Sequence, residues 1–304
     1  MVNKNAWIEL RVWRQFVAVA EELHFGRAAA RLHMTQPPLT QAIAGLEQAL
    51  GGRLFDRTKR SVRLTPTGAA LLPDVRDLLA RAQALPAKAR AAAAGEEGQL
   101  RLAFVSTVGF DLLPRWVRGF RSQWPHVALE LIEATGDVQL QLLASGEVDA
   151  GFMLHAPGFS PPGLACLSTS LEPLVLALPE SHALAQNAQL SLRQVLAEPL
   201  VIFPRRILPS VYDAVFGMYN AAGRSPQVAQ EAIQMQTIVN LVSAGMGLAW
   251  VPQSVRQFQR PGVVYRRVDG ARGLAVPECE TSLVWRESNL APTLARLIAF
   301  AKAQ

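Results

Sequence analysis

The stretch MTQPPLTQAIAGLEQ, residues 34–48, places two adjacent prolines at the mouth of an apparent helix. Its leucines and isoleucine recur at steps of three and four, which gathers them on one helix face. The first four N–H groups of a helix have no internal partner, so Pro37 and Pro38 cost no hydrogen bond there. The sequence therefore predicts a stiff, abrupt helix start, with Pro37 as the first helical residue and Gln36 as the cap.

Thr35 lies just outside the helix in this interpretation. As a cap, its hydroxyl would face two imides that have no N–H to donate. The helix start then displays Thr35, Gln36 and Thr40 to a partner outside the protein.

Two more helices are expected before this one. The first carries an apolar stripe between residues 10 and 23, and the second is the short segment GRAAARLH, residues 26–33. Two crossed helices joined by a short turn, the second polar on its outer face, form a helix-turn-helix. In GRLFDRTKRSVRLTPTG, residues 52–68, apolar pairs flank a polar tip, which predicts a small hairpin, or wing, with Arg57, Lys59 and Arg60 at its end.

The charge of the chain is concentrated at its start. Residues 1–64 hold ten Lys and Arg against five Asp and Glu, which gives +5 of the net +6. A charged hairpin tip alone is usually just solvated, and a polar helix face is ordinary. Their coincidence with a compact basic head favours a polyanion partner, and DNA is the best explanation.

Each predicted contact has a chemical reason. The amides of Gln36 and Gln41 can pair with an adenine edge, and Thr35 and Thr40 can reach phosphates or a thymine methyl. Arginines on a wing suit phosphates or a narrow minor groove. Glu47 has the wrong charge and is expected to pair with an arginine inside the module. The predicted DNA-binding residues are Thr35, Gln36, Pro37, Pro38, Thr40, Gln41, Arg57, Lys59 and Arg60.

A long helix is expected to connect this module, residues 1–64, to the rest of the chain. Thr65 is its expected cap and Pro66 its first residue, apolar residues then recur at heptad-like spacing from Leu71 to Leu85, and the linker helix is expected over residues 65–94. Such a stripe should pair with a copy of itself. Pro73 can be absorbed near the start, whereas we expect Pro86 to kink or end the helix. Residues 95–98 are the expected hinge.

From residue 99 to residue 304, strand patterns alternate with helix patterns. This predicts parallel sheets with helices on both faces, in two units whose cleft binds a small ligand at the carboxyl ends of the strands. The segment GMGLAW faintly resembles a dinucleotide fingerprint, but a helix precedes it and a strand follows. Gly245 is better interpreted as a helix C-cap.

Several classes of protein are disfavoured. No run of about 18 or more apolar residues lacks charges, and the start of the chain has no apolar region of signal-peptide type. We expect a cytoplasmic protein that does not enter a membrane. Cys166 and Cys279 are too few for a disulfide framework or a zinc ribbon; structural cysteines are the simpler interpretation, and a redox-sensing pair is the alternative. The histidines are scattered, and we expect no metal and no cofactor.

The chain resembles the LysR-type transcriptional regulators along nearly its whole length. The resemblance rests on the alanine-rich second helix, TQPPLT, the LE…LG spacing, LF.R before the wing and LTPTG at the linker. It continues through FVST, LASGEVDAGF, FPR and VSAGMGLAWVP. The segments QPPLT and LAFVSTVGF look most like the branch that controls degradation of aromatic compounds and responds to muconate-type diacids. Gln41 stands where this family often has an arginine.

The resemblance implies an N-terminal all-α winged helix-turn-helix, a dimerising linker helix, and a C-terminal α/β effector domain with two lobes like a periplasmic binding protein. Lobe I would span residues 99–169 and 273–304, and lobe II residues 170–272. Tetramers on promoter DNA, contact with RNA polymerase and a small-molecule effector, here an organic acid, are also implied. The implied effector-binding residues are Ser106, Thr107, Thr135, Phe203, Pro204 and Arg205, with Arg206 as a possible further partner for a carboxylate.

Ser106 and Thr135 could equally be helix caps, and an arginine after a strand could simply be solvated. The alternative from another class is a two-lobed binding protein or enzyme with an incidental basic head. We expect a regulator without catalytic activity.

Overall fold

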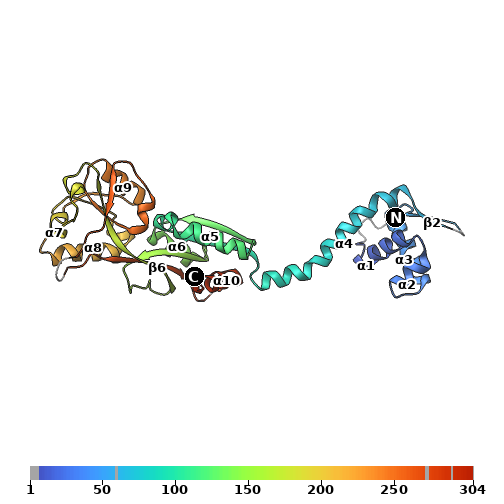
Figure 1. Cartoon of the computed structure of the whole chain (residues 1–304). Helices are drawn as coiled ribbons and strands as arrows, with labels where there is room; N and C mark the ends of the chain where they lie inside the picture. Colours follow the sequence, from blue (N-terminus) through green and yellow to red (C-terminus); the bar gives the residue numbers. More distant parts are fainter. Residues whose placement is uncertain (1–6, 59–60, 271–273, 289, 304) are drawn as a thin grey trace. The chain divides into compact units, whose positions relative to one another are not determined.

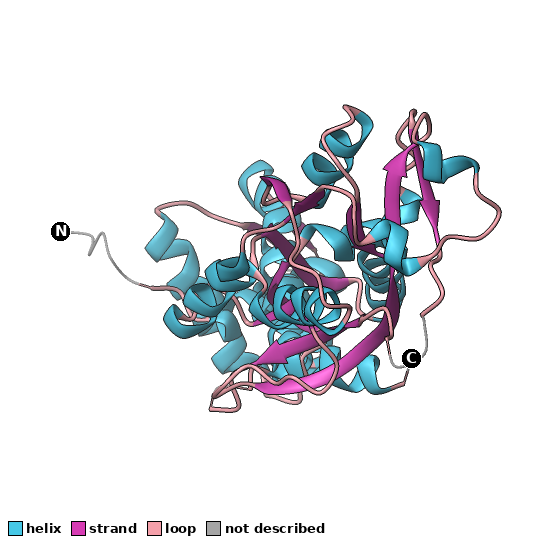
Figure 2. Cartoon of the chain, turned by 90° about the vertical axis from the view of Figure 1, so that its left-hand side faces the viewer, coloured by secondary structure: helices cyan, strands magenta, loops and turns pink. Residues whose placement is uncertain are grey.

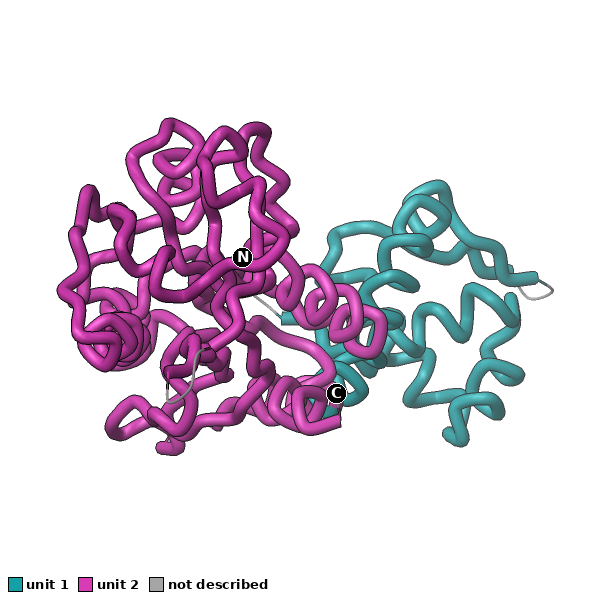
Figure 3. Tube along the Cα trace, turned by 60° about the vertical axis from the view of Figure 1, so that its left-hand side comes forward, with its two compact units in different colours: residues 1–90 teal, residues 91–304 magenta. Residues whose placement is uncertain are grey.

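The computed structural model describes residues 7–58, 61–270, 274–288 and 290–303. The chain divides into two compact units, Met1–Arg90 and Ala91–Gln304, which Figure 3 shows in different colours. Helices and strands of both units are distinguished by colour in Figure 2. None of the helices in the described ranges combines the length and the apolarity that a bilayer-spanning segment needs.

The first unit has the winged helix-turn-helix order that its sequence predicts (Figure 1). Its apolar residues from every element form one core, centred on Phe16, Leu39, Ile43 and Phe55. Strand β1 pairs with β2 in an antiparallel hairpin, the predicted wing. The elements are α1 (Leu10–Glu22), α2 (Phe25–Arg31), α3 (Gln36–Leu50), β1 (Phe55–Arg57), β2 (Val62–Leu64) and α4 (Pro66–Ala93).

The start of α3 corrects one prediction. The helix begins at Gln36, and Thr35 occupies the N-cap position, so Pro37 is the second helical residue rather than the first. The Thr35 side chain makes no capping hydrogen bond. The Thr35 hydroxyl has no N–H group to accept from at Pro37 and Pro38, as the sequence indicated, because proline lacks one. Both prolines still lie among the first four residues, where no helix hydrogen bond is lost.

The linker helix α4 spans nearly the range that the sequence predicted, residues 65–94. Its start is as predicted, because the Thr65 hydroxyl accepts a hydrogen bond from the Gly68 N–H at 3.1 Å. It continues through Pro73 and Pro86 to Ala93, so of the two predicted effects of Pro86, a kink or the end of the helix, the end is wrong. The residues around Pro86 are mostly Ala, Leu, Lys and Arg, whose high helix propensity offsets the cost of one proline. The next strand begins at Glu97, so the last two residues of the predicted hinge belong to it.

Lobe I of the second unit is a sheet covered on both faces. Strands β4, β3 and β5 lie side by side and are parallel. Helices α5 and α10 pack on one face through Trp116 and Leu297, and α6 packs on the other through Leu143. The elements are β3 (Glu97–Phe104), η1 (Ser106–Phe110), α5 (Leu112–Gln123), β4 (His126–Glu133), α6 (Gly136–Ser145), β5 (Ala150–His155) and α10 (Pro292–Lys302).

Lobe II has a separate core built on the far half of strand β6. Strands β9 and β10 flank β6, and β7 pairs with β8. The elements are β6 (Ala165–Pro179), η2 (Ala183–Gln186), α7 (Leu192–Val195), β7 (Leu200–Ile202), η3 (Arg205–Ile207), α8 (Pro209–Ala221), β8 (Val228–Glu231), α9 (Met235–Ser243), β9 (Ala249–Pro252), η4 (Gln253–Gln257), β10 (Val263–Arg266) and β11 (Glu278–Trp285).

The main sheet is mixed, whereas the alternating pattern predicted parallel sheets. Its order is β10-β6-β11-β5-β3-β4, with β9 also on β6. Strand β6 carries the chain out of lobe I and β11 brings it back, so the two run antiparallel. Their pairing shifts register between Thr281 and Ser282, where the strands pass from one lobe core to the other.

Gly245 ends helix α9, as its sequence context predicted. Gly245 follows α9 with a φ of +80°, and its N–H bonds to the Val242 carbonyl, as a helix-ending glycine does. Strand β9 comes after it, so the dinucleotide fingerprint is absent at this point.

Cys166 and Cys279 are free thiols, and their strand partners Val284 and Glu172 lie far apart along the β6–β11 ladder. This placement fits structural cysteines rather than a redox pair.

Candidate nucleic-acid interface and interlobe cavity

The exposed start of α3 displays most of the residues predicted to contact DNA. Thr35, Gln36 and Gln41 are exposed, as are both prolines. Thr40 is half-buried, and its hydroxyl donates to the Gln36 carbonyl at 3.0 Å. Thr40 therefore has its hydroxyl hydrogen in use, although the oxygen can still accept.

A groove of about 780 Å³ runs between the start of α3, the start of α2 and the wing. His24 forms part of its wall and caps α2, because its Nδ1 accepts from the N–H groups of Gly26 and Arg27 at 3.1 and 3.2 Å. The groove combines amide, hydroxyl and imidazole groups, which suit the backbone of a duplex. Its described lining is Leu23, His24, Phe25, Gly26, Gln36, Thr40, Arg57, Thr58, Ser61 and Val62.

Arg57 lies next to the tip of the wing, as predicted, because its pair with Val62 is the last one before the turn. It is the last residue of β1, and its guanidinium donates to Glu47 at 2.7 Å and lies 4.7 Å from the centre of the Phe25 ring. Glu47 also accepts the N–H groups of Leu54 and Phe55. The expectation that Glu47 pairs with an arginine of the module is confirmed. Lys59 and Arg60 lie outside the described residues.

Other arginines of the first unit are also bound to acids. Glu21 accepts from Arg76 at 2.7 Å and pairs with Arg31 at 2.8 Å. The hydrogen bond from Arg76, aided by Arg31, lowers the pKa of the Glu21 carboxyl. Arg27 donates to the Glu22 backbone carbonyl and to its side chain. Part of the basic charge therefore holds the module together and is only partly available to a partner.

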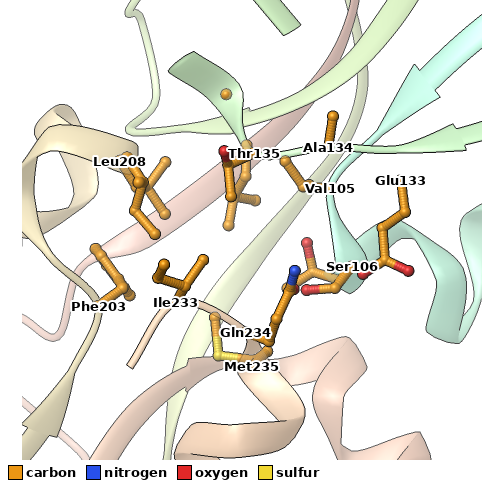
Figure 4. Close-up of a pocket in the computed structure, with 14 residues that line it drawn as sticks. Val105, Ser106, Glu133, Ala134, Thr135, Phe203, Leu208, Ile233, Gln234 and Met235 are labelled. Atoms are coloured by element: carbon orange, nitrogen blue, oxygen red, sulfur yellow. The ribbon is translucent and has the colours of Figure 1, made fainter. Parts of the chain in front are cut away.

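A cavity of about 500 Å³, its open mouth included, lies between the two lobes of the second unit (Figure 4). Both lobes contribute to it, at the ends of β3, β4, β5 and β7 and at the start of α9. The lining is mostly apolar, with hydroxyl groups on the lobe I side. The described lining residues are Val105, Ser106, Thr107, Glu133, Ala134, Thr135, Gly136, Leu154, Phe203, Ile207, Leu208, Ile233, Gln234 and Met235.

The cavity brings together four of the six residues that the sequence pointed to. Ser106, Thr107, Thr135 and Phe203 line it, whereas Pro204 and Arg205 do not. The Arg205 guanidinium is exposed and makes two hydrogen bonds of 2.7 Å to Asp213. Because Asp213 binds the guanidinium outside the cavity, the position of Arg205 does not support its predicted interlobe role. Arg206 is exposed and is also absent from the lining.

The polar groups of the cavity differ in how well they are bonded. The Thr135 hydroxyl donates to Asp137 and does not cap α6. Thr107 is only 5% exposed, and its hydroxyl has no hydrogen-bond partner among the described residues. Helix α9 starts at the cavity with no side-chain cap and no acid in its first turn. A buried hydroxyl and a bare helix start offer donors to a ligand.

Sequence reasoning missed the apolar wall from lobe II. Ile207, Leu208, Ile233 and Met235 look like ordinary core residues in a pattern of hydrophobicity. One signal was present, because Ile233 and Gln234 follow a strand and precede a helix, as Ser106 does. Within the described ranges, no group of three His, Cys, Asp or Glu could hold a metal ion.

Two family models match the chain and together span nearly all of it. Residues 10–69 match the "Bacterial regulatory helix-turn-helix protein, lysR family", and residues 93–304 match the "LysR substrate binding domain". The chain belongs to the LysR family of DNA-binding transcriptional regulators. The expected family and the two-part fold are thereby confirmed.

Relatives of this LysR-type regulator match along most of their lengths. It is 46% identical to the HTH-type transcriptional regulator IlvR of Caulobacter vibrioides over 292 residues, 96% of each chain. It is 36% identical to AlsR of Bacillus subtilis over 297 residues, 98% of this chain and 96% of AlsR. A crystal structure of full-length CbnR complexed with its target DNA superimposes with a TM-score of 0.80 at 30% identity, covering 97% of this chain and 99% of that one.

Proposed function

We propose that this LysR-type regulator binds promoter DNA through the start of α3 and the wing, and that a small organic acid in the interlobe cavity controls this binding. The observation that carries the proposal is the cavity itself, because residues of both lobes line it. A ligand that contacts both lobes favours one lobe arrangement over others, and such a bias is what a ligand needs to shift a conformational equilibrium.

The cavity favours a ligand with one carboxylate and an apolar body. The donors are the hydroxyls of Ser106 and Thr107 and the free N–H groups at the start of α9, which suit an anionic oxygen. Lys and Arg are absent from the described lining, so a second carboxylate would be buried without a cation. This supports an aromatic or branched monocarboxylic acid over a dicarboxylic acid.

Self-association through α4 is part of the proposal. Leu78 and Leu85 of this helix are 43% and 62% exposed, although they belong to the apolar stripe. A second copy of α4 would bury them, as expected for a dimerising linker helix. Pairs of dimers on DNA, contact with RNA polymerase and action in the cytoplasm follow from the family resemblance.

We propose that the protein acts by binding alone, without catalysis and without a cofactor. Both matching models describe binding modules, one for DNA and one for a small molecule. Turnover of a metabolite by the purified protein would instead favour the alternative of an enzyme with an incidental basic head.

The test begins with genomic DNA fragments selected on the purified full-length protein and sequenced. Affinity for the enriched site and for random DNA is then measured at several salt concentrations, with and without a panel of organic acids. A regulator loses affinity steeply as salt rises, prefers one site, and changes its affinity or its footprint with one class of acid. Equal, weak binding to all fragments in low salt would overturn the proposal.

A further inference from the structure

The only charged side chain in the described lining of the interlobe cavity is negative. Glu133 is the last residue of β4 and stands at the mouth of the cavity, exposed to solvent. It has no salt-bridge partner among the described residues, whereas Glu47, Asp149 and Asp213 each pair with an arginine. A carboxylate that faces a ligand site and lacks a cation is free to bind a cationic group of the ligand.

Donors for an anionic group lie next to this carboxylate. In Figure 4 the side chains of Glu133 and Gln234 both extend toward Ser106. Thr107 follows Ser106, and its buried hydroxyl has no partner in the described chain. Gln234 is the N-cap residue of α9, whose first turn carries neither a capping side chain nor an acid. One side of the cavity therefore offers both a negative group and a set of hydrogen-bond donors.

The other side of the cavity is apolar. Phe203, Leu208 and Ile233 lie there in Figure 4, away from the carboxylate of Glu133. Ile233 is 45% exposed, which is unusual for an isoleucine and leaves apolar surface for a ligand to cover. The cavity thus separates a charged side from a hydrophobic side.

From this arrangement we infer that the effector is an α-amino acid with an apolar side chain. Its carboxylate accepts from Ser106, Thr107 and the start of α9, and its ammonium group binds Glu133. Its side chain packs against Phe203, Leu208 and Ile233. The inference rests on the proposed function. It narrows the class of acid to amino acids, because a simple carboxylic acid has no group that could bind the Glu133 carboxylate.

A simple monocarboxylic acid fits the donors equally well but brings its negative charge close to Glu133. Like charges at close range disfavour binding, whereas the zwitterion places each charge against its complement. The ammonium group therefore decides between the two classes of ligand.

The experiment compares matched ligands on the full-length protein by isothermal titration calorimetry. The sets are L-leucine, 4-methylpentanoate and 3-methylbutylamine, and L-phenylalanine, 3-phenylpropanoate and 2-phenylethylamine. At least one amino acid should bind tenfold or more tightly than the acid and the amine of its set, and its D-enantiomer should bind more weakly. Glu133→Gln should remove the preference for the amino acid over the acid.

Glu130→Gln is the matched control. Glu130 lies on the same strand three residues earlier, is exposed in the same way, and accepts from Gln99 outside the cavity lining. This variant should keep the preference. Circular dichroism of both variants confirms that they fold.

The outcomes separate the inference from the proposed function. If the acids bind as tightly as the amino acids, or if Glu133→Gln leaves the preference intact, the inference is overturned and the organic-acid effector stands. If neither set binds while other organic acids do, the inference is overturned in the same way. If no acid of any kind binds or alters DNA affinity, the proposed function fails as well.

Discussion

The two units of this LysR-type regulator differ in the surroundings of two carboxylates, Glu21 in the first and Glu172 in the second. In the DNA-binding unit, Glu21 and Glu47 are each held by arginines, and Arg76 lowers the pKa of Glu21. In the effector unit, Glu172 lies near the junction of the lobes, and burial raises the pKa of its carboxyl despite two hydrogen bonds from Ser254. Glu21 and Glu47 are thus bound to cations, whereas the described residues give Glu172 no salt-bridge partner and only the hydrogen bonds from Ser254.

Net charge predicted the partner of the first unit but not the charged group in the cavity of the second. The excess of basic residues in the first unit correctly indicated DNA. Several of those residues, Arg57 and Arg31 among them, also stabilise the module through ion pairs. In the second unit, a nearly neutral charge balance gave no hint of the lone carboxylate in the cavity. The location of a charge and its partner therefore matters more than the sum.

The largest effect is expected at Glu47. Glu47→Ala removes the acceptor for the N–H groups of Leu54 and Phe55 and the partner of Arg57. Because Leu54 and Phe55 are buried, we expect a loss of about 2–4 kcal/mol in the free energy of unfolding of the first unit. Hydrogen exchange at the two amides measures this loss.

Glu47→Gln is the matched control for this prediction, because it keeps one oxygen to accept from Leu54 and Phe55 and removes the charge and the oxygen that accept Arg57. It should cost about 1 kcal/mol or less. Equal losses in the two variants would show that the ion pair with Arg57, not the backbone hydrogen bonds, holds the wing.

The next effect concerns DNA recognition by Gln36. Its side chain is exposed at the start of α3 and can pair with an adenine edge. Gln36→Ala should weaken binding to the specific site by about 1–3 kcal/mol and should weaken binding to random DNA much less. Affinities for both DNAs, measured at one salt concentration, test this. Similar losses on both would reduce Gln36 to a positioning role.

Much of the fold could be predicted because it depends on patterns within single segments. The spacing of Leu39 and Ile43 gave α3, Thr65 and Pro66 gave the start of α4, and Gly245 gave the end of α9. The mixed direction of the sheet could not be predicted in this way. It depends on β6 and β11 crossing between the lobes, and neither strand carries a local signal of its direction.

The site was predicted less completely, for a related reason. Ser106 and Thr135 follow strands and precede helices, so they stand out as polar residues at strand ends. Leu208 and Met235 line the same cavity but look like core residues until the two lobes face each other. Arg205 had the right charge to bind a ligand carboxylate, but it forms an ion pair with Asp213 on the following helix instead. A local ion pair is cheaper in entropy than one across a cleft.

A smaller effect is expected at Thr107, where a substitution should raise the free energy of unfolding instead of lowering it. Its hydroxyl is buried without a partner in the described chain, and such a group costs free energy. Thr107→Val keeps the shape and should raise the unfolding free energy of the ligand-free protein by about 1 kcal/mol, while it weakens effector binding. Thermal unfolding with and without the effector measures both changes.

Thr169→Val is the control, because the Thr169 hydroxyl donates to the Thr281 carbonyl at 2.8 Å. This variant should lower stability by about 1 kcal/mol and leave the cavity lining intact. A loss of stability in Thr107→Val as well would mean that its hydroxyl is bonded in solution.

The smallest effect tests the difference between Glu21 and Glu172 directly through pH. Glu21 has a lowered pKa, so it contributes stability above its ordinary value of 4.5 that is lost as the pH falls through the folded pKa. Glu172 has a raised pKa, so its contribution is present below 4.5 and is lost as the pH rises through the folded pKa. At pH 7, Glu21→Gln should therefore be less stable than the natural protein, and Glu172→Gln should be slightly more stable. Both differences, each below about 1 kcal/mol for partly exposed groups, should shrink on acidification as the natural carboxyls become protonated. If both variants shift stability in the same direction at pH 7, the two units do not differ in the way that their geometry indicates.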